Sequence, residues 1–262
     1  MFKKRIIVAV FLCFILFGFA GQAYSSSTYS IASINNREIA VGSNSYGKHM
    51  RIMVEKGTEK YYYSLNNKKE NLPIQLGDGS YTVKILQNVS GNRYKVLDKS
   101  TLTVKGSNDL DVYLSSSQPV YWAGMDKLDA LTKSLTLNLT TDKEKINAIY
   151  SYVIENIKYD NNKINDISTD YVPQLEEILN TKTGICYDYA ALFAGMLRSE
   201  GIHTKLAKGY KKDMKEYHAW NEVLIDGNWV IVDTTYDAAL NKLKNKPNMY
   251  KRMDEYTKQR EY

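Results

Sequence analysis

Two runs of alternating apolar residues meet at Asp226-Gly227, and this junction constrains the fold more than any other feature of the chain. The runs cover residues 218–225 and 228–233. An Asp-Gly pair between two such runs is a strong signal for a β-hairpin with a two-residue loop. The sequence therefore predicts two antiparallel strands that are adjacent both in the chain and in space.

The length of this loop decides which side chains share a face of the sheet. With two loop residues, Ile225 lies opposite Asn228 and Trp220 lies opposite Asp233, so that His218 is one diagonal step from Asp233 on the same face. Diagonal neighbours are ~7–8 Å apart at Cα, which an imidazole and a carboxylate can bridge. A symmetric four-residue loop keeps this arrangement, whereas a three-residue loop would place the two side chains on opposite faces.

A cysteine comes directly before a stretch of helical period. Apolar residues follow Cys186 at helical spacing until Gly201, at positions Tyr189, Leu192, Phe193, Met196 and Leu197. The pattern places Cys186 at or near a helix N-terminus, where free N–H groups and the macrodipole favour a thiolate. We expect Gly184 to allow a tight turn just before it. Cys186, His218 and Asp233 would then supply a nucleophile, a base and an orienting residue.

Three segments of the chain resemble known motif blocks. GICYDYAALFAGMLRSEGI, YHAWNEV and NWVIVDTTYD resemble those of the transglutaminase-like superfamily, thiol enzymes with a papain-type triad on an α+β core, over about residues 140–240. The order Cys, His, Asp and the spacings of 32 and 15 residues suit its compact bacterial members. The resemblance implies that Cys186 is the nucleophile, His218 the general base and Asp233 its partner. The resemblance does not fix the oxyanion hole. The backbone N–H of Cys186 is the natural first donor, and the second donor is unassigned.

The first 23 residues have the pattern of a secretory signal peptide. Lys3–Arg5 supply positive charge, Ile6–Ala20 is an apolar run, and small residues lead up to Ala23. At ~1.5 Å per residue this run is shorter than the ~30 Å apolar core of a bilayer, so an uncleaved anchor is the weaker alternative. Cleavage would leave Cys186 as the one cysteine of a secreted or cell-surface protein without internal disulfides.

Composition excludes several classes of protein. Hydrophobic residues make up 44% and charged residues 24% of the 262 residues, which excludes wholesale disorder and a polytopic membrane protein. The net charge of +6 falls to +3 without the signal peptide, since basic residues then number 32 rather than 35 against 29 acidic ones. No basic stripe accompanies this small charge, so we expect no nucleic-acid partner.

The mature chain divides into two expected domains. Residues 24–117 contain short β-like runs separated by turn residues, which predicts a small all-β sandwich that serves as a binding or spacing module. The runs lie at 49–55, 60–65, 81–88, 93–97 and 102–105. Residues 118–262 form the expected catalytic domain. There, Thr141 and Glu144 have the spacing of a capping box before a helix that runs through Lys158.

Other conspicuous residues have structural interpretations. Asp188 is expected to be a first-turn helix acid and Tyr189 a packing residue, while His49 and His203 are interpreted as strand or surface residues. A single cysteine with distant histidine and aspartate lacks the paired-ligand spacing of a zinc site. We therefore expect neither a metal nor a cofactor.

The sequence thus predicts an α+β fold in which a helix-borne Cys186 packs on an antiparallel sheet, preceded by a small all-β sandwich. The predicted function is attack of Cys186 on an amide of a protein or peptide, with cell-wall or extracellular material as a source of substrate. Water would resolve the thioester in a peptidase or amidase, and an amine would resolve it in a cross-linking transamidase. A non-catalytic surface module is a third possibility. Neither the substrate nor the oligomeric state follows from the sequence.

Overall fold

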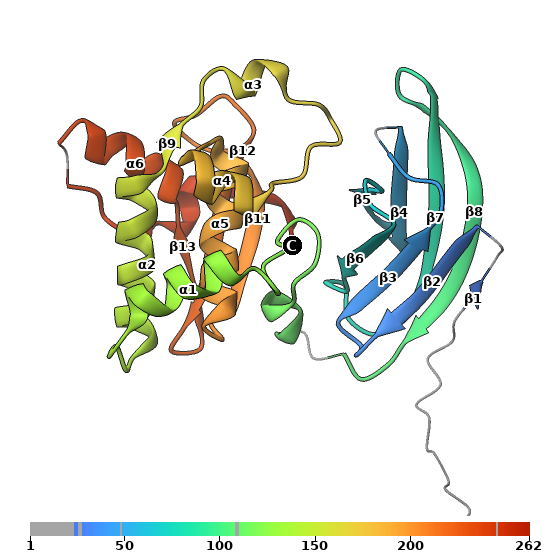
Figure 1. Ribbon diagram of the computed structural model, residues 1–262, viewed down its shortest axis with the longest axis horizontal. Helices are drawn as coiled ribbons and strands as arrows, with labels where there is room; N and C mark the ends of the chain where they lie inside the picture. Colours follow the sequence, from blue (N-terminus) through green and yellow to red (C-terminus); the bar gives the residue numbers. More distant parts are fainter. Residues whose placement is uncertain (1–23, 26–27, 48, 108–109, 245) are drawn as a thin grey trace, which may run out of the picture.

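The computed structural model describes residues 24–25, 28–47, 49–107, 110–244 and 246–262. The predicted signal peptide, residues 1–23, lies outside the described residues. The chain forms two halves, one of strands alone and one of helices packed on one side of a sheet (Figure 1). This arrangement confirms the predicted α+β fold with an all-β region at its N-terminal side.

The all-β half consists of two four-stranded antiparallel sheets. One has the order β1-β2-β3-β6 and the other β5-β4-β7-β8. Their strands are β1 Tyr24–Ser25, β2 Tyr29–Ile34, β3 Glu38–Ser43, β4 Met50–Lys56, β5 Glu59–Ser64, β6 Lys69–Pro73, β7 Gly79–Ser90 and β8 Arg93–Val104. Alternate apolar side chains from both sheets, such as Ile39 and Ile52, form one shared core.

Strand β8 corrects one detail of the sequence analysis. The runs 93–97 and 102–105, expected to be two strands, belong to one strand that ends at Val104. Polar residues between the two runs interrupt the apolar pattern. The backbone of residues 98–101 nevertheless pairs with β7, and the register shifts beyond them, between Ile85 and Leu86 of β7. A polar stretch continues a strand when its backbone is paired and its side chains face solvent.

The second half packs helices against a five-stranded antiparallel sheet of order β14-β13-β12-β11-β15. Its strands are β11 Thr204–Lys211, β12 His218–Ile225, β13 Asn228–Val232, β14 Tyr250–Lys251 and β15 Tyr256–Glu261. Its α-helices are α1 Asp126–Thr136, α2 Asp142–Asn156, α3 Lys163–Asp166, α4 Leu175–Thr181, α5 Cys186–Ser199 and α6 Thr234–Lys242. Strands β9 Lys158–Tyr159 and β10 Thr183–Gly184 form a short parallel pair, and η1 Asp111–Leu114 and η2 Met253–Glu255 are 3₁₀ turns.

Helix α5 is the centre of this half. It is buried along nearly its whole length between the sheet and the other helices, with Phe193 and Leu197 in the main apolar core. Helix α2 packs against α5 in the same apolar core. It begins with the predicted capping box, because Thr141 and Glu144 bond each other's backbone N–H groups.

The hairpin between β12 and β13 has the predicted register. Ile225 pairs with Asn228 and Asn221 with Val232. The loop residues Asp226 and Gly227 both have positive φ, 51° and 78°, as a two-residue hairpin loop with a type I′ turn requires.

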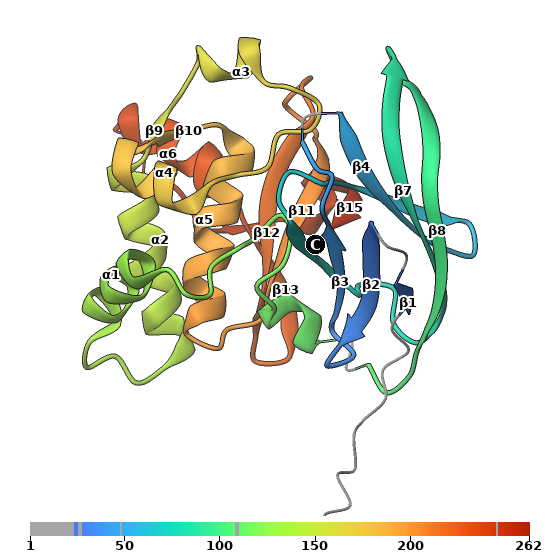
Figure 2. The same cartoon turned by 45° about the vertical axis from the view of Figure 1, so that its right-hand side comes forward.

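The last strand of the chain lies between the two halves. Strand β15 pairs with β11, and Figures 1 and 2 both show the C-terminus at this junction. The ring of Tyr262 contacts those of Tyr61 and Tyr63, with centroids 5.7 and 6.0 Å apart. The connecting segment is also tied down, since the Gln118 side chain bonds both backbone groups of Ser64. A domain boundary at 117/118 stays a prediction.

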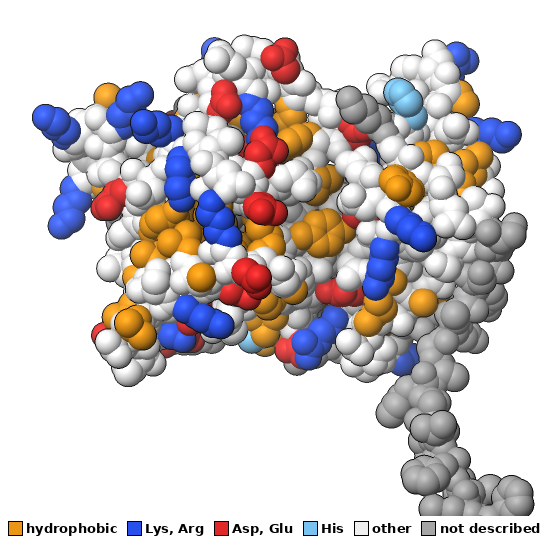
Figure 3. Space-filling view, in the orientation of Figure 1, with side chains coloured by type: hydrophobic (Ala, Val, Ile, Leu, Met, Phe, Trp, Pro, Cys, Tyr) orange, Lys and Arg blue, Asp and Glu red, His pale blue; other side chains and the backbone are white. Residues whose placement is uncertain are grey.

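No described helix has the length and apolar character needed to cross a membrane. On the face drawn in Figure 3, basic side chains are scattered over both halves with acidic ones among them.

Candidate active site

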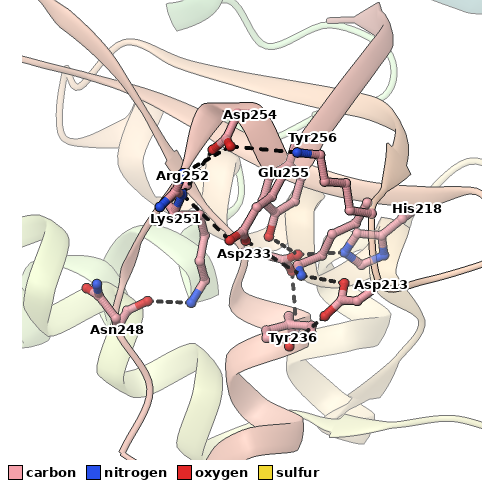
Figure 4. A network of polar contacts seen from close by, with 12 residues as sticks. Asp213, His218, Asp233, Tyr236, Asn248, Lys251, Arg252, Asp254, Glu255 and Tyr256 are labelled. Atoms are coloured by element: carbon pink, nitrogen blue, oxygen red, sulfur yellow. Dashed lines mark hydrogen bonds and ion pairs between the residues drawn. The ribbon is translucent and has the colours of Figure 1, made fainter.

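His218 and Asp233 are in direct contact. His218 begins β12, and Asp233 directly follows β13, so the hairpin brings them together (Figure 4). The imidazole Nε2 lies 2.8 Å from Asp233 Oδ2, and both side chains are buried. A bond of this length to a buried carboxylate orients the ring and keeps a proton on Nε2. The remaining nitrogen, Nδ1, is available to another group.

Asp233 is held from three directions. Besides His218, the Tyr256 hydroxyl donates to Oδ2 at 3.0 Å, and the Tyr236 backbone N–H donates to Oδ1 at 3.0 Å. The last of these bonds makes Asp233 the N-cap of α6. Asp233 therefore ends a strand, starts a helix and orients a histidine with the same carboxylate.

Cys186 is the first residue of α5, where the apolar period places it. Its side chain is half-buried and interacts with that of His218. The expected reason for Gly184 is wrong. The φ angle of Gly184 is not positive, and the residue lies in the extended strand β10. Its role is steric, because a Cβ there would lie 2.6 Å from the Cβ of Asp188.

The environment of His218 keeps it charged. Burial alone would lower its pKa, but the hydrogen bonds to Asp233 and Cys186, together with the negative charges of both, raise the pKa to about 10. His218 is therefore protonated at neutral pH. A protonated imidazole next to a thiol is the arrangement that stabilises a thiolate.

Asp188 has the structural role expected for a helix first turn. Its carboxylate is fully buried and accepts the backbone N–H of Ile185 at 2.9 Å. It also accepts the Tyr171 hydroxyl at 2.5 Å and lies 3.0 Å from Lys163 Nζ. These bonds fasten the segment around α3 to the end of α5 that carries Cys186.

Three residues near the site carry no sequence signal that singles them out. Tyr256 comes from the C-terminal segment, for which the sequence predicts no role. Tyr159 lies opposite Gly184 in the β9–β10 pair, and its pKa is raised to about 12 by burial and by the charges of Cys186 and other acids. Lys208 on β11 interacts electrostatically with Cys186. Each depends on a contact between segments far apart in the chain.

The remaining candidate residues either lie outside the site or join the elements that carry it. His49 is exposed, and His203 is half-buried with Nε2 3.8 Å from Asp111. Asn221 fastens β12 to α5 by donating to the Ala190 carbonyl at 2.9 Å. Within the described parts of the chain, no group of three or more His, Cys, Asp or Glu side chains is arranged to hold a metal ion.

The segment that carries these residues has known relatives. Residues 129–234 match the model of the Transglutaminase-like superfamily, and they include Cys186, His218 and Asp233. This match confirms the resemblance to that superfamily that the three motif blocks predict. The kyphoscoliosis peptidases of Homo sapiens and Mus musculus are 35% identical over 74 residues. That match covers 24% of this chain and 11% of either peptidase.

Two solved structures have a partly similar course of the chain. A candidate cysteine protease from Cytophaga hutchinsonii is 18% identical with a TM-score of 0.42, over 72% of this chain and 73% of its own. The periplasmic domain of TgpA from Pseudomonas aeruginosa is 14% identical with a TM-score of 0.40, over 76% of this chain and 91% of its own. Similarity at this level carries no information on activity or substrate.

The raised pKa of His218 predicts a pH-dependent stability. A raised folded-state pKa adds stability that is fully present below the unfolded value, about 6.5, and is lost as the pH rises towards about 10. Asp233→Asn removes the carboxylate that raises this pKa. We expect the difference in unfolding free energy between wild type and Asp233→Asn, from urea titrations, to be largest at pH 6 and clearly smaller at pH 9.5. The half-exposed Asp213→Asn is the control; a pH-independent difference for Asp233→Asn would contradict the assignment.

The hydroxyl of Tyr256 should matter more than that of its neighbour Tyr236. Tyr256 bonds the buried Asp233, whereas Tyr236 donates to the exposed Asp213 at 2.9 Å. Loss of a bond to a buried charged group costs about 1.5–3 kcal/mol, and loss of a surface bond about 0.5 kcal/mol or less. We expect Tyr256→Phe to lower the unfolding free energy by the larger amount and Tyr236→Phe by the smaller. Equal effects would show that the bond to Asp233 contributes nothing specific.

Proposed function

We propose that this protein is a thiol enzyme that cleaves amide bonds of proteins or peptides through Cys186, His218 and Asp233. The observation that carries the proposal is the 2.8 Å contact between His218 and the buried Asp233, together with the interaction of the Cys186 side chain with His218. The superfamily match over 129–234 supports it, as does the name of the kyphoscoliosis peptidases.

In the proposed reaction His218 holds the proton of the Cys186 thiol. The thiolate attacks the amide carbonyl, the C–N bond breaks, and His218 gives its proton to the leaving amine. A thioester on Cys186 remains. The backbone N–H of Cys186 is one donor to the oxyanion. The Tyr159 hydroxyl is our candidate for the second, because Tyr159 pairs with Gly184, two residues before the cysteine, and its pKa responds to the charge of Cys186.

We further propose that water resolves the thioester. His218 takes a proton from the water, the hydroxide attacks the thioester carbonyl, and Cys186 leaves as a thiolate. An amine in place of the water would make the enzyme a transamidase, and no described residue marks an amine-acceptor pocket. We place the reaction outside the cell or at its surface, because residues 1–23 have the pattern of a signal peptide.

Alkylation of the single mature cysteine tests the activated thiol. In residues 24–262 we expect iodoacetamide to modify Cys186 rapidly well below pH 8, because its thiolate is paired with protonated His218, whereas an ordinary thiol ionises near pH ~8.5. Rates from pH 4 to 10 by mass spectrometry should show this reactivity lost in His218→Ala and kept in His203→Ala. A slow rate that rises only near pH 8.5 in all three proteins would overturn the proposed triad and favour a non-catalytic module.

The fate of the thioester separates hydrolysis from transamidation. We expect incubation with a glutamine-containing protein and a labelled primary amine to give peptide fragments or deamidated glutamine, and no incorporated label. Cys186→Ala serves as the inactive control. Label that depends on Cys186 would replace the hydrolase with a transamidase while leaving the triad intact.

A further inference from the structure

A cavity of about 200 Å³ lies between the two halves of the molecule, next to the proposed active site. Residues of both halves line it: Arg51, Tyr62, Tyr63, Ser64, Gln118, Pro119, Thr169, Tyr171, Val172, Tyr187, Lys208 and Tyr262. Tyr187 is the neighbour of Cys186 in the chain. Two basic side chains, Arg51 and Lys208, belong to this lining, and none of the described residues in it is acidic.

Lys208 is set apart from comparable lysines. Six other described lysines lie over aromatic rings, and each contacts an oxygen acceptor as well. The acceptors belong to Leu76 for Lys56, Asp188 for Lys163, Tyr152 for Lys182, Glu261 for Lys205, Asp213 for Lys211 and Asp237 for Lys251. Lys208 Nζ lies 3.1 Å from the centroid of the Tyr187 ring and 5.6 Å from that of Tyr262, and no oxygen acceptor for it occurs among the described residues.

Lys205 provides an internal comparison on the same strand. Its Nζ lies 4.4 Å from the Trp229 ring centroid and 3.2 Å from a carboxylate oxygen of Glu261. Lys205 and Lys208 are thus both cations over aromatic rings, and only the first of these two has a carboxylate. Burial lowers the pKa of Lys208 to about 7, because rings alone do not replace the water lost from the ammonium group.

We propose that this cavity is a subsite of the active site that binds a carboxylate of the peptide substrate, with Lys208 as its cationic partner. The inference rests on the proposed function. Lys208 is close enough to Cys186 for their charges to interact, so a carboxylate bound there would be near the amide under attack. The substrate class is therefore peptides that present a carboxylate near the amide under attack. The carboxylate belongs either to an acidic side chain or to the C-terminus of the peptide.

Charged and neutral alkylating reagents test this charge directly. Iodoacetate carries a carboxylate and iodoacetamide does not, so the ratio of their rates with Cys186 reports an anion site. At pH 6 we expect Lys208→Met to lower the iodoacetate-to-iodoacetamide ratio about five- to tenfold, the effect of one nearby unit charge. Lys208→Arg should retain the ratio, which also separates loss of charge from misfolding. Lys205→Met should leave it unchanged.

Protection from iodoacetamide tests binding and distinguishes the two sources of the carboxylate. N-acetylglutamate α-amide offers a side-chain carboxylate, N-acetylalanine a terminal one, and N-acetylglutamine α-amide is the neutral control. We expect saturable protection by one of the two acids, none by the neutral amide, and none in Lys208→Met. A lysine that acted only on the thiolate would change both alkylation rates alike and give no protection.

The outcomes distinguish failure of the carboxylate subsite from failure of the proposed thiol-enzyme function on which it rests. Fast iodoacetamide reaction with an unchanged ratio in Lys208→Met, or without saturable protection by either acid, would overturn the carboxylate subsite and leave the activated thiol standing. Slow reaction of Cys186 with both reagents would overturn the proposed function itself, and the subsite with it.

Discussion

Burial of the Asp233 carboxylate is the constraint on which the rest of the half with helices depends. A buried carboxylate is costly unless charge and hydrogen bonds replace the water it loses. Here the replacements are His218, the Tyr256 hydroxyl and the Tyr236 backbone N–H, which come from β12, β15 and the first turn of α6. One carboxylate thereby bonds to the hairpin, to the start of a helix and to the C-terminal strand. It also supplies the charge that keeps His218 protonated.

Those parts of the site that local chain chemistry determines were predictable from the sequence. The Asp226-Gly227 loop needs positive φ at both residues, and only one register of β12 against β13 follows from it. That register brings His218 to Asp233. The start of α5 at Cys186 was equally predictable, because the apolar period begins there and Asp188 caps the backbone three residues earlier. A structural and an orienting role of Asp233 are compatible, since the residue that contacts His218 is the N-cap of α6 as well.

Contacts between distant segments set the limit of that prediction. Strand β15 ends the chain with mostly polar, exposed residues, and nothing in them indicates that they pair with β11. Its buried member, Tyr256, is recognisable only once Asp233 is in place beside it. Strand β8 shows the same limit within the sandwich, where pairing to β7 carries the strand through a polar stretch. In both cases the partner strand decides the structure, because side-chain pattern alone does not report what a backbone pairs with.

The two lysines of β11 show how the same limit bears on function. Lys205 and Lys208 are both placed over aromatic rings, and no sequence pattern distinguishes them. What distinguishes them is the opposite surface: Glu261 faces Lys205, whereas a cavity with tyrosines and Arg51 faces Lys208. Part of that surface belongs to the β-sandwich. Because the sandwich contributes Arg51 and tyrosines to this cavity, the proposed subsite implies a sandwich that helps to select what Cys186 attacks. In that arrangement specificity would depend on the junction of the two halves, and the triad would supply the chemistry alone.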